Sequence, residues 1–163
     1  MKHYYIVKES KRIKWYTDMN DVFTAINNRQ IDYNWLITDI ECNKYNELYN
    51  DQKEDTIFIT GKELTRILNE SPPIQFIWGV FSGIPKEIPV DIKNLKNVPY
   101  ADGNSDIWNN NNLKIQHPDA VIEIICWDSS LFILLTENDE IGNAFKNYYM
   151  EAKDLLEVNK ESI

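Results

Sequence analysis

The sequence predicts a single α+β domain over residues 1–163, with a largely antiparallel mixed sheet and a long C-terminal amphipathic helix packed on it. Two observations predict this class. Strand-like runs outnumber helical segments and often follow one another directly, in the order β-β-α-β-β-α-β-loop-β-β-α. The chain is also long enough, at 163 residues with 43% hydrophobic content, to bury a core without disulfides.

In the first part of the chain, residues 4–8 and 12–16 are expected to form two short strands around the turn at 9–11. Asp18 has the side chain and the position to cap a short helix. The apolar run 34–42 then predicts a longer strand.

The middle of the chain predicts a strand, a helix and another strand. Residues 56–60 are apolar and β-branched, and Thr60 with Glu63 forms the capping-box pattern that opens a helix. The Ser-Pro-Pro sequence at 71–73 ends that helix, because proline cannot continue it. A further strand is expected over 75–82.

Residues 86–118 lack periodicity and are interrupted by prolines, a glycine and a run of asparagines, so they predict a long irregular excursion. Loops of this length are either functional or contain short helical elements. The runs 120–127 and 131–136 follow as two strands joined by a turn at 128–130. Their nearly continuous apolar character predicts central strands covered on both faces.

The last segment predicts one long amphipathic helix. Residues 136–139 resemble an N-terminal cap, with acidic side chains that suit the helix dipole. Apolar side chains then recur at helical spacing along one face: Ile141, Ala144, Phe145, Tyr148, Ala152, Leu155 and Leu156.

The charge distribution restricts the classes of partner. The chain carries 17 basic and 26 acidic side chains, for a formal charge of −9. Residues 1–16 carry five basic side chains and one acidic one, so the acidic excess lies in the remainder. A polyanion is repelled by nucleic acid and by anionic membranes. The charge therefore favours a basic protein partner and argues against nucleic acid and membranes.

The N-terminal residues, the cysteines and the glycines indicate the compartment and the absence of a nucleotide cofactor. Residues 1–16 lack the apolar stretch and cleavage site of a signal peptide, and no run is long enough to cross a bilayer. The two cysteines lie far apart in apolar runs, as buried thiols do in a reducing compartment. Five glycines and no phosphate-binding motif predict no nucleotide cofactor. We expect a cytoplasmic protein without a cofactor.

Five residues are the candidates for contact with a partner: Trp35, Asp39, Glu41, Trp108 and Asp128. Alternation along the strand predicts that Asp39 and Glu41 share a face with Trp35 and form an acidic patch. Trp108 lies in the irregular excursion, where a rigid indole either anchors a partner or pins the loop onto the core. The predicted mechanism is occlusion of a basic partner by acidic and aromatic side chains.

Two alternatives remain open from the residues alone. One is a small hydrolase or metal-dependent enzyme that uses Asp39, Glu41, His117 and Asp128, which requires these side chains to converge in one pocket. The other is a ligand-binding module in which 86–118 covers an apolar cavity. No catalytic motif or metal-ligand spacing is present, so the sequence predicts a protein that is not an enzyme and holds no metal.

Three stretches, residues 76–83, 115–118 and 123–130, resemble an uncharacterised family of small proteins from Bacillus-type bacteria. That family has no assigned activity, so the resemblance implies no catalytic residue. In its general character, a small acidic α+β chain rich in tryptophan, the protein is also similar to the immunity proteins that neutralise polymorphic toxins. This resemblance implies an inhibitor of a basic, nuclease-like toxin.

Overall fold

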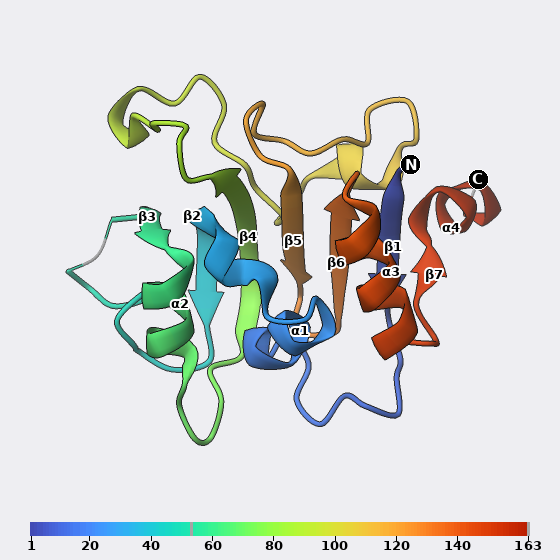
Figure 1. Cartoon of the computed structure of the whole chain (residues 1–163), viewed down its shortest axis with the longest axis horizontal. Coiled ribbons are helices and arrows are strands. Elements are labelled where there is room, and N and C mark those ends of the chain that lie inside the picture. The colour runs from blue at the N-terminus through green and yellow to red at the C-terminus, as the bar shows by residue number, and fades with distance from the viewer. Residues whose placement is uncertain (53, 163) are drawn as a thin grey trace.

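The computed structural model describes residues 1–52 and 54–162. Within these residues, seven strands form one open sheet in the order β3-β2-β4-β5-β6-β1-β7 (Figure 1). Every pairing between them is antiparallel, so the predicted α+β class is confirmed and the mixed character is not found. The strands are β1 (His3–Val7), β2 (Tyr33–Cys42), β3 (Thr56–Thr60), β4 (Phe76–Pro85), β5 (Ile122–Trp127), β6 (Leu131–Thr136) and β7 (Lys153–Asp154).

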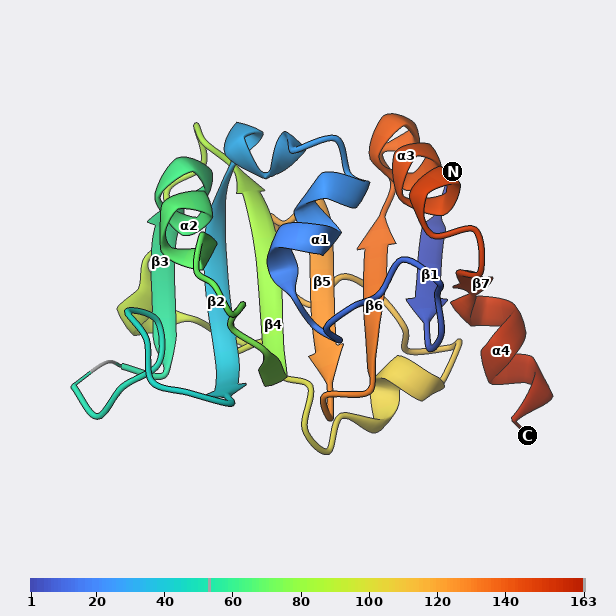
Figure 2. The ribbon, with the colours of Figure 1, turned by 90° about the horizontal axis from the view of Figure 1, so that it is seen from below.

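Three helices cover one face of the sheet: α1 (Met19–Ala25), α2 (Gly61–Leu68) and α3 (Asp139–Tyr148) (Figures 1 and 2). Their predicted caps are confirmed, because the side chains of Asp18, Thr60 and Asn138 each accept a backbone N–H from the first turn. A short 3₁₀ helix, η1 (Arg29–Asp32), leads into β2. Among the described residues, no helix has the length and apolar character needed to span a membrane.

The predicted irregular excursion covers the opposite face. Residues 86–118 contain two short 3₁₀ helices, η2 (Ile92–Asn94) and η3 (Ser105–Trp108), and run beneath the sheet in Figure 2. Their apolar side chains, among them Ala101, Ile107 and Leu113, pack against β4, β5 and β6. The central strands are therefore buried on both faces, as their apolar runs predicted.

The prediction of one long C-terminal helix is wrong. α3 ends at Tyr148, β7 pairs with β1 and forms the edge of the sheet, and the short helix α4 (Leu155–Glu161) begins on the other side of the sheet. Phe145 and Tyr149 belong to the core beneath the helices, whereas Leu155 belongs to the core beneath the loop, and one straight helix cannot reach both. Lys146 Nζ donates to two carbonyls of the crossing segment, and the Asp154 side chain caps α4.

The second predicted strand, residues 12–16, is also not formed. β1 pairs on one side with β6 and on the other with β7, so both of its edges are occupied by distant parts of the chain. Residues 8–18 instead cross from β1 to α1 as a series of turns, held where Tyr16 Oη donates to the Lys8 carbonyl. The Arg12 guanidinium lies 4.5 Å from the centroid of the Tyr148 ring.

A bulge in β2 changes which face its side chains occupy. Asp39 has a positive φ of 53°, and the register with β4 shifts between Thr38 and Glu41. Before the bulge, Trp35 faces the helices. After it, Glu41 lies opposite Trp78, whose side chain packs on the loop-covered face. The predicted shared face of Trp35 with Asp39 and Glu41 is therefore wrong, because strict alternation stops at the bulge.

Candidate functional site

An acidic depression of about 420 Å³ lies where the end of β2 meets the 86–118 loop. Asp55 reaches it from the residues before β3, and Trp78 from β4. Its carboxylates are Asp39, Glu41, Asp55 and Asp102, and its aromatic walls are Trp78 and Tyr100.

Asp39 holds the loop that forms one wall of this depression. Its Oδ2 accepts the backbone N–H groups of Ala101, at 2.7 Å, and Asp102, at 2.9 Å. The neighbouring Thr38 Oγ1 donates to the Pro99 carbonyl at 2.6 Å. Both side chains bind the same loop, so Asp39 positions the site through one of its two carboxylate oxygens.

The remaining three acids give the depression its charge. Glu41, Asp55 and Asp102 are solvent-exposed, and no cation within residues 1–52 and 54–162 forms an ion pair with any of them. Clustered carboxylates without a counter-charge create a negative potential that extends into solvent over a Debye length, about 8 Å at physiological salt.

A row of tryptophans continues from the depression across the sheet. The ring centroids of Trp78 and Trp127 are 5.0 Å apart, and those of Trp127 and Trp108 are also 5.0 Å apart, both pairs edge to face. All three side chains are partly buried. Trp108 therefore pins the loop onto the sheet and still presents part of its indole to solvent.

Trp35 is not a contact residue. Its side chain is fully buried on the helix-covered face, where Nε1 donates to the Gln30 carbonyl at 2.9 Å. Its ring lies 5.6 Å from that of Phe23. The prediction that Trp35 binds a partner is therefore wrong: the residue is part of the core.

The residues proposed for a hydrolytic or metal centre do not converge. Asp39 and Glu41 share the acidic depression, Asp128 is exposed in the turn between β5 and β6, and His117 lines a different cavity. Cys126 faces α1, with its Sγ 3.8 Å from the sulfur of Met19, and burial raises the pKa of its thiol. Within the described residues, no three acidic, histidine or cysteine side chains cluster closely enough to hold a metal ion.

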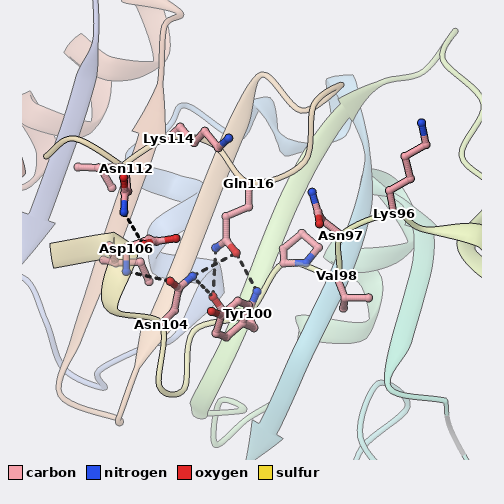
Figure 3. A pocket seen from close by; sticks show the side chains of 12 residues that line it. Lys96, Asn97, Val98, Tyr100, Asn104, Asp106, Asn112, Lys114 and Gln116 are labelled. Atoms are coloured by element: carbon pink, nitrogen blue, oxygen red, sulfur yellow. Dashed lines mark hydrogen bonds between the residues drawn. The ribbon is translucent and has the colours of Figure 1, made fainter. Parts of the chain in front are cut away.

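A second cavity, of about 390 Å³, lies within the 86–118 loop (Figure 3). Gln116 points to its centre, where Oε1 accepts from the Tyr100 N–H and from Asn104 Nδ2. Asn112 donates to Asp106 across the same cavity. Polar side chains that hold the loop together therefore dominate this cavity, unlike the apolar cavity that the ligand-binding alternative predicted.

Glu123 anchors the same network and was missed from the sequence. It is fully buried in the central strand β5, where its carboxylate accepts the Gln116 N–H at 2.9 Å and the Gln116 side-chain amide at 3.2 Å. Burial raises the pKa of Glu123 to about 7 despite these bonds. Its cross-strand neighbour Ser82 has a buried hydroxyl with no partner among the described residues. The available signal was a single acid within the apolar run 121–127.

Comparison with known proteins adds no relative: no family model, no curated protein and no solved structure matches the chain. The resemblance to an uncharacterised bacterial family and to immunity proteins therefore stays a prediction. The functional argument depends on the acidic depression and the tryptophan row beside it.

Proposed function

We propose that the protein is a binding module that occludes a basic protein partner, acting as an immunity protein against a nuclease-like toxin in the cytoplasm. One observation carries the proposal: Glu41, Asp55 and Asp102 meet in a single depression with no paired cation among the described residues. An enzyme that binds phosphates has a cationic active site, and a cluster of carboxylates imitates its substrate.

The aromatic side chains supply the apolar part of the contact. Tyr100 is 46% exposed at the wall of the depression, and Trp78 lies directly opposite Glu41 on the neighbouring strand. Rigid aromatic rings bury a large area at a small cost in side-chain entropy, and they recur at the centres of protein interfaces. Trp108 and Asp128 extend the same contact beyond the depression.

The test is a tagged pull-down from the source cell at low salt, with two matched double variants. Glu41→Gln/Asp55→Asn removes two charges from the depression, whereas Glu87→Gln/Glu161→Gln removes two exposed charges elsewhere. We expect a stoichiometric basic partner that the wild type and the second variant retain and that the first variant loses. Steering by charge also requires that association slows as salt is raised to about 0.5 M.

An activity assay of the captured partner tests the inhibitory role. If the captured partner is a nuclease, one equivalent of the wild-type protein should abolish its activity, and the Glu41→Gln/Asp55→Asn variant should not. A partner captured equally by both double variants, association unaffected by salt, or the absence of any stoichiometric partner would each contradict the proposal.

A further inference from the structure

A cavity of about 590 Å³ shares no residue with the acidic depression. It lies between the start of β1, the end of the 86–118 loop and the residues before α3. Its polar side chains include Lys2, Lys114 and His117, and its apolar wall is formed by Ile115, Pro118 and Val121. A volume of this size is within the range of small-molecule sites, about 300–1,000 Å³.

His117 lines this cavity and carries a hydrogen-bond donor that no described residue uses. The residue is only 6% exposed, and its Nδ1 accepts the Asp119 backbone N–H at 3.2 Å. A ring that accepts at Nδ1 carries its hydrogen at Nε2, and no described residue accepts that hydrogen. Burial lowers the pKa of His117, which favours the neutral ring.

The charged residues that line the cavity are basic in balance, and the acidic residue whose charge acts on His117, Asp119, lies beside the histidine ring. Lys2 and Lys114 form no ion pair with any residue in 1–52 or 54–162, and Lys2 Nζ lies 5.5 Å from the centroid of the Tyr4 ring. Glu137 is the acidic residue that lines the cavity. Two cations and one carboxylate leave one positive charge, which suits a singly charged anion better than a phosphate dianion.

We infer that this cavity binds a small monocarboxylate with an apolar chain. The carboxylate accepts from the two lysine ammonium groups and from His117 Nε2, and the chain packs against Ile115, Pro118 and Val121. Val121 is 38% exposed, so there is apolar surface for the chain to cover. This site is separate from the proposed partner surface, and either one can be disproved without the other.

The test is a titration with hexanoate, followed by ¹H–¹⁵N NMR of the full chain. We expect saturable shifts confined to residues of this cavity, including the His117 Nε2 resonance, which reports its new acceptor directly. Lys114→Met should weaken binding about tenfold, as the loss of one charge-assisted hydrogen bond does. Lys62→Met, which removes an exposed lysine from α2 on the other face, should leave the affinity unchanged.

Three further probes test separately whether the charge and the apolar chain of the ligand are required. Hexanol lacks the charge and should not bind, and acetate lacks the chain and should bind more weakly than hexanoate. Hexyl phosphate carries the wrong charge and should also bind more weakly. Equal binding of hexanol or acetate, tighter binding of hexyl phosphate, or no saturation by hexanoate at about 10 mM would each overturn the proposal.

Discussion

The two faces of the sheet are covered by different kinds of structure. Helices whose backbone hydrogen bonds are internal cover one face, and the 86–118 loop covers the other. The loop pairs only part of its backbone groups internally, and side chains from the sheet and from α4 bind others. Asp39, Thr38 and Glu123 bind loop groups, and Asn159 donates to the Ile107 carbonyl. The polar side chains that hold the backbone of the loop therefore lie on the loop-covered face.

The largest expected effect lies on the helix-covered face. Phe145→Ala removes a fully buried ring that contacts Phe132 and Tyr149, so we expect a loss of about 3–5 kcal/mol in the free energy of unfolding. Leu113→Ala on the loop-covered face should cost about 2 kcal/mol, because a loop relaxes into a cavity more easily than a helix does. Urea unfolding of both variants measures the difference.

Hydrogen exchange tests whether the two faces of the sheet unfold separately. In Leu113→Ala, the Ala101 and Asp102 amides held by Asp39 should exchange faster, while amides in β5 and β6 stay protected. If all amides accelerate together, the loop unfolds with the sheet and the two faces form one cooperative unit.

The helix-covered face was the easier one to predict from sequence. Its caps at Asp18, Thr60 and Asn138 are local signals, and its apolar stripes follow the helical period. The break between α3 and α4 was missed because Ala152 and Leu155 continue that period in sequence. The change of face depends on the pairing of β7 with β1, which is a contact between distant parts of the chain.

The next effect concerns the pH dependence of stability. The Glu123 carboxyl keeps its proton up to about pH 7 in the folded protein, whereas the unfolded chain releases it near its ordinary value of 4.5. Between these values the folded state binds more protons, so the stabilisation is fully present below pH 4.5 and is lost as the pH rises through 7. The loss amounts to about 3 kcal/mol.

Glu123→Gln removes this titration. The free energy of unfolding of the variant, measured relative to the wild type in urea at several pH values, should rise by about 3 kcal/mol between pH 4.5 and pH 8. His117, whose pKa is lowered by burial, contributes the opposite slope, but it is present in both proteins and cancels. A difference that does not change with pH would show that Glu123 is ionised throughout.

A smaller effect tests how Asp39 holds the loop. Asp39→Ala leaves the Ala101 and Asp102 N–H groups without their acceptor and places alanine at a positive φ, so we expect a loss of about 1–3 kcal/mol. Asp39→Asn keeps an acceptor oxygen and a side chain that tolerates this backbone conformation, and it should recover most of the stability. Equal losses in both variants would mean that the charge, not the hydrogen bonds, is what matters.

The acidic site was predictable in composition but not in geometry. Asp39 and Glu41 were identified as neighbours on a strand, and the structure places both in the same depression. Their separation from Trp35 depends on the bulge at Asp39, and no local sequence pattern predicts this bulge. The positive φ of Asp39 is stabilised by hydrogen bonds to residues 101 and 102, which are distant in sequence. Asp55 and Asp102 join the site only through tertiary contacts.

The smallest expected effect separates function from stability. Glu41 is exposed and unpaired among the described residues, so Glu41→Gln should change the free energy of unfolding by less than about 0.5 kcal/mol. The same change should weaken capture of a basic partner, because the lost charge faces the proposed interface. Asp39→Asn is the matched control, because the Asp39 carboxylate binds the backbone of the loop. If the two variants are equally stable, Asp39→Asn should weaken capture less than Glu41→Gln does. If the two variants lose the partner equally, Asp39 contributes its charge to the partner as well as its hydrogen bonds to the loop.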